Sequence, residues 1–595
     1  MKIWKITKKR KIKMGETILK GIPASPGVII GKAYLIDSED VTVSKRHITD
    51  KDLPDEINRL QDALINTRNE ILKIKEKISK EMGMEHGEIF SAHLLVLEDT
   101  MFIEEVISTM KKEKIGVEYA FLEVLQKYIK TFSKMDDEYL RERISDINDV
   151  GKRVLRNLLG TKQKSLDNLK EQVIIIAYDL SPSDTAVMHK KNVIGFATDI
   201  GGRTSHTAIM AKSLEIPAVV GLEKVTTVVR NGDAIIVDGN QGLIITEPQK
   251  KTLEKYIAAK KRYEELEKEL STLKNLPCET LDGHRVELSA NIELPEEISS
   301  VIKHGADGIG LYRSEFFYIN RTDLPNEEEQ YKAYKEVAGK MAPKPVIIRT
   351  LDLGGDKFLS QLEIPREMNP FMGWRAIRFC LARPDIFKIQ LRAILRASTY
   401  GNLKIMYPMI SGVEEVRQAN VILGEVKDQL RKEKIHFAKN IEVGVMIEIP
   451  SAALTSDIIA KEVDFFSIGT NDLIQYALAV DRVNEKIAYL YEPAHPAVLR
   501  LIKSVIDNGH KEKIWVGMCG EMAGDPALTL ILLGLGLDEF STSPILLPEI
   551  KKMTRAFTLQ EAKKIAEKAL TFSTGKEVEE FAHQRLKEVL PQFVL

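Results

Sequence analysis

The sequence is poor in cysteine, carries almost no net charge and has no long apolar run. Its three cysteines, Cys278, Cys380 and Cys519, are too few and too far apart for a zinc cluster or a disulfide scaffold, and they indicate a reducing compartment. The net charge of −1 argues against a generally basic nucleic-acid binder. The longest apolar run, residues 528–537, is interrupted by glycines and falls far short of the roughly 20 residues that span a membrane.

The overall composition is that of a large globular protein. Apolar residues make up 44% and charged residues 29% of the 595 residues, and at roughly 100–200 residues per domain the length suggests about three to five domains. The charge is uneven, because residues 1–14 hold many lysines and no acid. No apolar segment or small-residue cleavage site follows them, so a signal peptide is not indicated. We expect residues 1–14 to be a basic, disordered leader, or Met14 to be the natural first residue.

The apolar pattern divides the first half of the chain into three parts. Residues 17–36 alternate short apolar runs with glycine and proline, which is typical of short strands and turns. Between residues 52 and 159 the apolar residues recur at spacings of three, four and seven, which predicts about four amphipathic helices. Strand-like runs return from residue 172. A helical block is therefore predicted to interrupt a β-rich α/β domain that resumes after it.

The second half begins with a long charged helix and then alternates strands with helices. Residues 249–276 are dense in Lys and Glu and predict a surface helix that links the two halves and is ended by Pro277. Strand-like runs follow at 286–292, 308–313, 345–353, 403–410, 443–450, 463–469, 514–517 and 539–544. Eight strands that alternate with helices predict a (β/α)8 barrel, with a doubly wound sheet as the alternative.

Polar residues follow several of these strands, at the end where a (β/α)8 barrel carries its active site. In chain order they are Arg313, Arg349, Glu448, Asn471, Asp472 and Cys519. Arginines can bind phosphate and carboxylate through paired hydrogen bonds, and two carboxylates with substrate oxygens and waters suit Mg²⁺. A small phosphate ester on Mg²⁺ fits this set. Cys519 is a candidate proton donor or nucleophile, although a lone cysteine is more often a packing residue.

A second candidate site lies in the first half, in the run GGRTSHTAIMAKSL that begins at Gly201. Two glycines permit a tight turn, and the residues after Thr-Ser-His have helical spacing. His206 would then lie at a helix N-terminus, where backbone N–H groups favour an anion, and its imidazole could carry a phosphoryl group. A surface or capping histidine is an equally good interpretation of this spacing alone.

Several long motifs together resemble the phosphoenolpyruvate-utilising enzymes, and among them the enzyme I family of the bacterial sugar phosphotransferase system. The run GGRTSHTAIMAKSLEIPAVVG resembles the phosphohistidine motif that these enzymes share. The others, in chain order, are GIPASPGVIIGKA, GIGLYRSEF, VIIRTLDLGGDK, NPFMGWRAIR, GVMIEIPSAAL, FFSIGTNDLIQYALAVDR and GMCGEMAGDP. The resemblance runs in order from residue 15 to the C-terminus, which makes chance similarity negligible.

The resemblance implies a multidomain α/β fold, in which a phosphohistidine α/β domain with an inserted helical bundle precedes a (β/α)8 TIM-type barrel. The phosphohistidine domain would be formed by residues 15–48 and 161–248, on either side of a helical HPr-binding subdomain at 49–160. A helical linker at 249–277 would then lead to a barrel at 278–595, which binds phosphoenolpyruvate and forms the dimer.

The resemblance also implies a reaction, carried out in the cytoplasm by a homodimer. Phosphoenolpyruvate phosphorylates His206, pyruvate is released, and the phosphoryl group passes to a histidine of the phosphocarrier HPr as the first step of sugar uptake. Cys519 matches the proton donor, and Thr185 matches a residue that hydrogen-bonds the histidine. Glu448 and Asp472 match the Mg²⁺ ligands. The matched substrate contacts are Arg313, Arg349, Asn471, Arg482, Lys357 and Arg375.

Two other interpretations stay open. Pyruvate phosphate dikinase and phosphoenolpyruvate synthase share the histidine motif and the barrel, but they carry a nucleotide-binding domain ahead of it, and no Gly-rich nucleotide loop is visible in this sequence. A non-catalytic signalling protein that senses phosphoenolpyruvate is the other interpretation, although a pure sensor need not keep both an acid and a nucleophile.

Overall fold

The computed structural model describes residues 16–36, 43–81, 93–94, 96–132, 138–160, 171–180, 192–201, 211, 216–318, 324–353, 367–482, 484 and 486–589. The chain divides into two compact units, Met1–Glu264 and Glu265–Leu595. No helix within the described ranges is long and apolar enough to cross a membrane.

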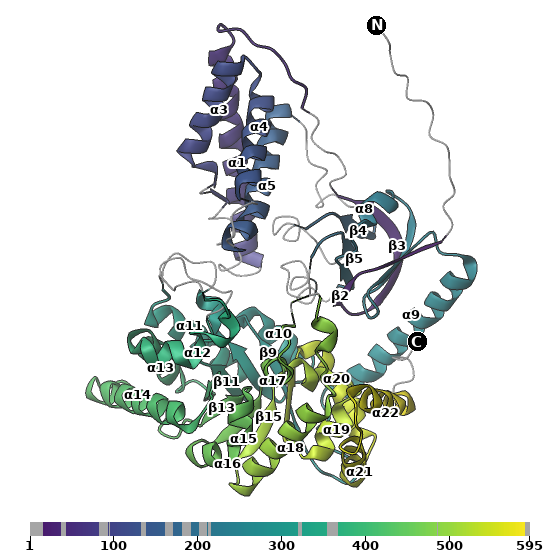
Figure 1. Cartoon of the computed structure of the whole chain (residues 1–595), viewed down its shortest axis with the longest axis vertical. Helices are drawn as coiled ribbons and strands as arrows, with labels where there is room; N and C mark the ends of the chain where they lie inside the picture. Colours follow the sequence, from purple (N-terminus) through teal and green to yellow (C-terminus); the bar gives the residue numbers. More distant parts are fainter. Residues whose placement is uncertain are drawn as a thin grey trace. The chain divides into compact units, whose positions relative to one another are not determined.

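An eight-stranded sheet forms the β-rich part of the first unit (Figure 1). Its strands are β1 Thr17–Lys20, β2 Ile22–Ser25, β3 Val28–Leu35, β4 Val173–Ala177, β5 Val193–Thr198, β6 Ala218–Val220, β7 Ala234–Asp238 and β8 Leu243–Thr246, and the short helix α8 spans Val225–Val228. The order is β1-β8-β7-β3-β4-β5-β6-β2, with parallel pairing from β3 to β6 and antiparallel pairing elsewhere. β4 is buried throughout, because a parallel strand inside a sheet is covered on both faces. Strands from both sides of the helical block therefore share one sheet.

Four of the helices between β3 and β4 run side by side as a bundle (Figure 1). They are α1 Leu53–Glu81, α3 Thr100–Glu113, α4 Val117–Phe132 and α5 Glu138–Leu159. The start of α3 is capped by Asp99, whose Oδ1 accepts hydrogen bonds from the N–H groups of Met101 and Phe102 at 2.9 and 3.1 Å. Val106, Met110 and other apolar residues at helical spacing form the buried core of the bundle. The predicted helical block is confirmed.

An ion-pair network crosses this bundle. Glu56, which is 4% exposed, lies 2.6 Å from Arg46 Nη2 and 3.0 Å from Arg59 Nη1. Arg59 also pairs with Glu118. The second carboxylate oxygen of Glu56 accepts a 2.9 Å hydrogen bond from Val117 N–H at the start of α4. Burial raises the pKa of Glu56, but hydrogen bonds from Arg46, Val117 and Arg59 outweigh it and leave that pKa below its usual value.

Helix α9, Lys250–Thr272, contributes side chains to the cores of both units. Near its start Tyr256 packs in an apolar cluster of the first unit, and its hydroxyl donates a 3.2 Å hydrogen bond to Asp238. Near its end Leu266 and Leu270 belong to the core of the barrel. The sequence predicted this helix, although it ends a few residues earlier than the charged run does.

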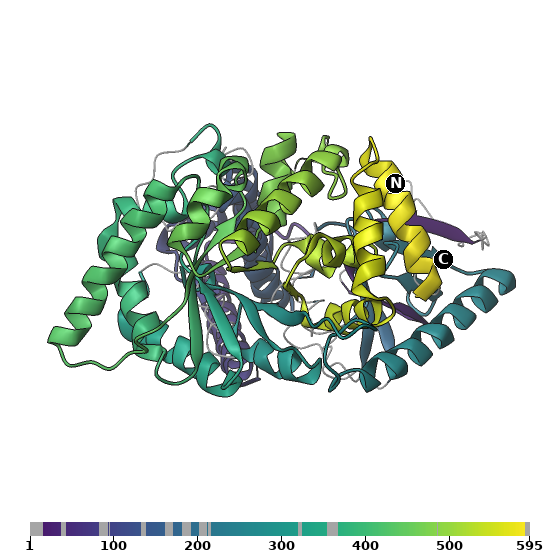
Figure 2. The same ribbon diagram turned by 90° about the horizontal axis from the view of Figure 1, so that it is seen from below.

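The second unit is built around a closed barrel of eight parallel strands in the order β10-β11-β12-β13-β14-β15-β16-β9 (Figures 1 and 2). The strands are β9 Glu287–Ile292, β10 Gly308–Arg313, β11 Pro345–Arg349, β12 Asn402–Tyr407, β13 Val443–Ile447, β14 Phe465–Ile468, β15 Trp515–Met518 and β16 Glu539–Thr542. All eight predicted strands are present, so the barrel is confirmed over the doubly wound sheet. Several predicted strands extended too far, because the residues after β11, β12 and β13 are site loops that carry strand-like apolar residues.

Helices follow most of the barrel strands, as the alternation in the sequence predicted. They are α10 Ile298–Lys303, α11 Glu327–Met341, α12 Ala376–Ala382, α13 Pro384–Ala397, α14 Val413–Lys432, α15 Pro450–Leu454, α16 Ser456–Ile459, α17 Thr470–Leu478, α18 Pro496–Lys511, α19 Thr529–Leu535, α20 Leu547–Arg555, α21 Leu559–Ala569 and α22 Gly575–Val589. Together with the eight-stranded sheet of the first unit and its inserted bundle, they confirm the multidomain α/β fold class.

The inside of the barrel has an apolar and a polar sector. Alternate residues of each strand face inward, and the apolar ones form a separate buried cluster. Its members are Leu311, Ile347, Met406, Met446, Phe465 and Cys519, with Trp515 packed against them. On β9, β14 and β16 the residues that alternate with outward-facing core residues are instead polar. These inward polar residues are Ser289, Asn291, Ser467, Glu539 and Ser541.

Candidate active site

The predicted site residues lie at the carboxyl ends of the barrel strands. Arg313 and Arg349 are the last residues of β10 and β11. Glu448 and Cys519 directly follow β13 and β15. Asp472 lies in the first turn of α17, just after β14. Because all eight strands are parallel, these ends meet at one face of the barrel.

Two buried arginines are joined into one ion-pair chain by Asp352. Arg349 Nη1 lies 3.0 Å from one oxygen of Asp352, and Arg375 Nη2 lies 2.8 Å from the other. Arg375 Nη2 also lies 3.5 Å from Asp472 Oδ2, and Arg349 pairs on its other side with Glu315. Burial lowers the pKa of both arginines, but the carboxylates outweigh it and raise that pKa above its usual value. Both guanidinium groups are therefore charged and held in fixed orientations.

Glu448 is a deeply buried acid beside these arginines. It is 2% exposed, and its Oε1 accepts a 2.6 Å hydrogen bond from the N–H of Met409. Burial, together with the negative charges of Asp472 and Asp352, raises the pKa of Glu448 to about 8. Met409 itself adopts a left-handed backbone with φ of 57°, which is strained for a residue with a side chain. Strain at this position orients an N–H group toward the carboxylate.

The acids at this face fit a divalent cation. Glu448 and Asp472 present hard oxygen ligands, and burial together with the charges of Asp472 and Asp352 disfavours the ionised form of Glu448. A cation would supply the missing positive charge. Within the described ranges no three His, Cys, Asp or Glu side chains converge in ligand geometry. The two carboxylates would therefore provide part of a coordination shell, as is usual for Mg²⁺ bound with substrate oxygens and waters.

Three further predicted contacts lie nearer the rim. The Arg313 side chain is 36% exposed and pairs with Glu293. Arg482 is similarly exposed, and its Nη1 lies 3.8 Å from a carboxylate oxygen of Glu521. Asn471 Oδ1 accepts a 2.8 Å hydrogen bond from the N–H of Glu521. Asn471 thus orders the loop after Cys519, while the two arginines remain accessible from solvent.

Cys519 is a buried neutral thiol. Its side chain lies among the inward apolar residues, and its Sγ lies 3.9 Å from the carbonyl oxygen of Ile468, a contact in which the thiol is the donor. Burial raises the pKa of Cys519 to about 11; the nearby Glu448 adds to this effect, and Ser467 opposes it. The sulfur therefore carries a proton at neutral pH, as an acid must. Cys278 and Cys380 are also buried but lie in the core between strands and helices.

The structure thus brings together Arg349, Arg375, Glu448, Asp472 and Cys519, with Arg313, Asn471 and Arg482 at the same face. His206, Thr185 and Lys357 lie outside the described residues. Their roles stay predictions.

Sequence reasoning did not assign roles to the acids that hold the arginines. Glu293, Glu315 and Asp352 each pair with a predicted substrate contact. A signal was present, because Glu315 and Asp352 follow Arg313 and Arg349 by two or three residues in SEF and TLD. An arginine that is to be buried needs a carboxylate nearby, so these positions could have been named.

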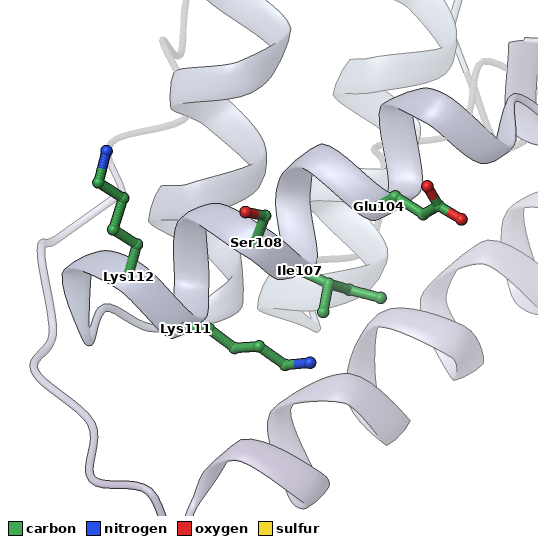
Figure 3. Close-up of a pocket in the computed structure, with 5 residues that line it drawn as sticks. All are labelled: Glu104, Ile107, Ser108, Lys111 and Lys112. Atoms are coloured by element: carbon green, nitrogen blue, oxygen red, sulfur yellow. The ribbon is translucent and has the colours of Figure 1, made fainter.

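A pocket lies on the helical bundle of the first unit (Figure 3). It is lined by Glu104, Ile107, Ser108, Lys111 and Lys112, all from α3. Because one helix supplies every lining residue, it is a depression along a helix surface rather than an enclosed site. It contains none of the predicted site residues.

Comparisons with known proteins identify the family. Residues 267–559 match the family model of the PEP-utilising enzyme, PEP-binding domain, and residues 20–143 and 169–242 match its N-terminal and mobile domains. The phosphoenolpyruvate-protein phosphotransferase of Bacillus subtilis (strain 168) is 49% identical over 569 residues, which cover 96% of this chain and 100% of the relative. That of Geobacillus stearothermophilus is 50% identical over 566 residues, which cover 95% and 98%.

The chain belongs to the phosphoenolpyruvate-protein phosphotransferase family. The resemblance to enzyme I found in the sequence is therefore confirmed. A solved structure described as an NMR solution structure of Enzyme I (nEIt) is 50% identical; the match covers 41% of this chain and 99% of that chain, with a TM-score of 0.36. Within the phosphoenolpyruvate-protein phosphotransferase family, the buried arginines, acids and thiol of the barrel are the natural candidates for the chemistry.

Proposed function

We propose that this chain transfers the phosphoryl group of phosphoenolpyruvate to its own His206, releases pyruvate, and passes the phosphoryl group to a histidine of the phosphocarrier HPr. One observation carries the proposal. Two fixed arginines, two carboxylates and a neutral thiol meet at the carboxyl end of the barrel, in a chain that aligns over nearly its whole length with phosphoenolpyruvate-protein phosphotransferases. This set matches a small substrate with a phosphate, a carboxylate and a carbon to be protonated.

The arginines would bind the two anionic groups of the substrate. Arg349 Nε has no hydrogen-bond partner among the described residues, although the residue is almost fully buried. Such a donor is costly unless a ligand accepts from it, which supports a role in substrate binding. Arg313 and Arg482 would reach the substrate from the rim, and Lys357 is proposed as a further positive contact. Asn471 would contact the substrate while it holds the loop after Cys519.

Glu448 and Asp472 would hold Mg²⁺. The bound ion would neutralise charge on the phosphate and offset the repulsion between the two acids. Arg375, which lies between Asp352 and Asp472, fixes the Asp472 carboxylate in place. The N–H of Met409 fixes the Glu448 carboxylate in the same way. The chain therefore orients both ligands through its own hydrogen bonds.

Cys519 would protonate the enolpyruvate that remains after phosphoryl transfer. Removal of the phosphoryl group leaves a carbon that must gain a proton to give pyruvate. The Cys519 thiol holds its proton at neutral pH and faces the inside of the barrel at the carboxyl end of the strands. The thiol can thus donate its proton directly to the substrate carbon.

The second transfer would take place on the first unit. His206 would carry the phosphoryl group with Thr185 as its hydrogen-bond partner, and the helical block at 49–160 would bind HPr. The phosphohistidine domain would comprise residues 15–48 and 161–248, with residues 249–277 as the linker and the barrel at 278–595 forming a homodimer. The scarcity of cysteine, and the three buried free thiols, support a reducing cytoplasm.

One assay tests the proposal. Purified protein is mixed with phosphoenolpyruvate, Mg²⁺ and HPr without nucleotide, and pyruvate and phospho-HPr are measured together. Equal amounts of both products are expected, and His206→Ala should yield neither. Pyruvate release that requires a nucleotide would favour a dikinase or synthase reaction, and substrate binding without pyruvate release would favour a sensor.

A further inference from the structure

The absence of a side chain at Gly517 lets the Glu539 carboxyl lie against β15, one inward-facing position before Cys519. Along β15 and the residue after it, Trp515, Gly517 and Cys519 face inward, and neighbours on one face of a strand are about 7 Å apart. A Cβ placed on Gly517 would lie 2.5 Å from Glu539 Oε2. The carboxyl of Glu539 therefore occupies the space that a side chain at position 517 would fill.

Polar groups approach this space from both neighbouring strands. Gly517 is paired with Ser467 on β14 and with Glu539 on β16. Glu539 is 2% exposed and Ser467 is fully buried, yet among the described residues neither Glu539 Oε2 nor Ser467 Oγ has a hydrogen-bond partner. The same holds for the hydroxyl of Ser289 on β9. Buried polar atoms are nearly always satisfied, by ordered water where the protein supplies no partner.

Ser467 also connects this space with the thiol. Its hydroxyl lowers the pKa of Cys519, so it lies close to the sulfur even though it falls outside hydrogen-bond geometry with any described group. The backbone on the far side is fixed, because Asn291 Nδ2 donates a 2.9 Å hydrogen bond to the carbonyl of Cys519. Ser541 Oγ in turn donates to Asn291 Oδ1 at 2.6 Å. Ser467 thus borders both the thiol and, through its pairing with Gly517, the position that the Glu539 carboxyl occupies.

We propose that Glu539 returns a proton to Cys519 after each turnover, through water beside the Ser467 hydroxyl. The inference rests on the proposed function, in which the Cys519 S–H bond breaks as a C–H bond forms on enolpyruvate. The resulting thiolate takes a proton from the bridging water, and the water takes one from the Glu539 carboxyl. Glu539 is then reprotonated by solvent before the next turnover. Glu539 does not touch the substrate in this scheme. It acts through Cys519, whose proton it restores, and is therefore a positioning residue.

The charges around Glu539 suit this role. Burial is the main reason that the pKa of Glu539 is raised to about 7; Glu287 and Asp307 contribute to the rise, and Ser289 and Lys404 oppose it. Lys404 does not neutralise the acid, because its Nζ lies 2.8 Å from Glu442 and 4.6 Å from the centre of the Trp515 ring. A carboxyl with a pKa near neutrality can both give up a proton and regain one under physiological conditions.

The test separates the first turnover from later ones in the full-length protein. Rapid-quench measurements with phosphoenolpyruvate, Mg²⁺ and excess HPr at pH 7 would compare Glu539→Gln with the wild type. In the variant we expect a first-turnover burst of one pyruvate per active site at the wild-type rate, followed by a steady-state rate at least tenfold lower. Equal losses in both phases, or no loss in either, would overturn the inference. A wild-type protein that forms no pyruvate would instead overturn the proposed function.

Two further variants and a control keep the test decisive. Glu539→Asp retains an acid at this position, so its steady-state rate should exceed that of Glu539→Gln; equal rates for the two would overturn the inference. Gly517→Ala places a methyl group where the Glu539 carboxyl lies, displaces that carboxyl and should lower the steady-state rate as well. Glu549→Gln serves as the control, because burial raises the pKa of Glu549 to about 8 but this acid lies on α20, outside the barrel interior. It should leave both phases unchanged.

The pH dependence of the steady-state rate gives a further test, because a purely structural role of Glu539 would not alter it. The wild-type steady-state rate should fall as the pH rises through about 7, because ionised Glu539 has no proton to give. The first-turnover rate should not share this fall, and the steady-state profile of Glu539→Gln should lack it. Identical profiles for wild type and variant would overturn the inference.

Discussion

Each of the two units contains an arginine–carboxylate network of similar size, and the two networks have different roles. In the helical bundle, Arg46 and Arg59 share Glu56 and Glu118, and both arginine side chains are more than a third exposed. In the barrel, Arg349 and Arg375 share Asp352, and all three side chains are at most 9% exposed. The same residue types thus form a partly solvated network in one unit and a dry one in the other.

The difference lies in what each network leaves unsatisfied. In the bundle, the hydrogen bonds to Glu56 outweigh its burial, so its pKa is below the usual value and the network is complete without a ligand. In the barrel, Glu448 retains a raised pKa and Arg349 Nε lacks a partner among the described residues. A completed network stabilises a fold, whereas a buried network with an unpaired acid and an unpaired donor is prepared for a charged ligand.

The strongest test of this contrast is Arg349→Lys. Lysine keeps the charge but cannot hold Glu315 and Asp352 while also donating from a planar group to the substrate. We expect kcat/KM for phosphoenolpyruvate to fall by about 10²–10³. Pyruvate release measures the loss, and phosphoryl exchange between phospho-HPr and the protein should stay at the wild-type rate as the control. A loss of less than tenfold would mean that this arginine is only structural.

The next test is Glu448→Gln, which removes the uncompensated acid. Metal binding, followed by Mn²⁺ electron paramagnetic resonance, should weaken at least tenfold. In the wild type, metal affinity should rise with pH until about pH 8, because the carboxylate must lose its proton before it can bind, and the variant should lose this dependence. Unchanged affinity and an unchanged pH profile would remove Glu448 from the metal site.

The same variant makes a prediction about stability in the absence of metal. The pKa of Glu448 is higher in the folded state than in the unfolded state, so ionisation favours unfolding and the wild type loses stability as the pH rises from about 4.5 toward 8. With EDTA present, Glu448→Gln should therefore raise the barrel's melting temperature at pH 8. Below about pH 4.5 the two proteins should have the same melting temperature. A variant that melts lower at pH 8 would contradict this account.

In the bundle, Arg59→Met should affect stability rather than chemistry. It removes one partner from the buried Glu56 and from Glu118, which should cost about 1–3 kcal/mol of unfolding free energy. Calorimetry should show a lower transition for the first unit and an unchanged one for the barrel. Pyruvate formation in the first turnover should not change. A loss of turnover at intact stability would show that this network does more than hold helices.

The smallest effect is expected from Arg68→Met, the matched control on the same helix. Arg68 lies 3.4 Å from Glu98, and both side chains are more than half exposed. Exposed pairs contribute about 0–1 kcal/mol. Calorimetry should therefore find the first unit unchanged within about 1 kcal/mol, and a loss as large as that of Arg59→Met would remove the distinction between buried and exposed pairs.

Much of the barrel could be predicted from its sequence, because short apolar runs that alternate with helical spacing allow few folds. The positions of Arg313, Arg349 and Glu448 followed from the rule that polar residues at strand ends meet at one face. The partners of these residues could not be derived in the same way. Glu293 and Met409 join the site through the closure of the barrel and a left-handed backbone, and neither leaves a local signal in the sequence.

The polar interior of the barrel shows the same limit. Ser467 and Glu539 stand in runs that read as ordinary strands, and only the register of three neighbouring strands places both beside Gly517. The sequence alone cannot tell an inward serine from an exposed one when a strand is only a few residues long.

Helix α9 sets a limit on how the protein can be divided for experiments. Tyr256 completes an apolar cluster of the first unit, while Leu266 and Leu270 complete the core of the second. A fragment that stops at residue 248 would leave Val28, Ile236 and Ile245 uncovered, and one that starts at residue 278 would expose barrel surface that those leucines cover. Expression clones for the separate units should therefore share the helix, with the first extended past Tyr256 and the second begun before Leu266. Fragments cut at the ends of the helix would be prone to aggregation for reasons unrelated to their activity.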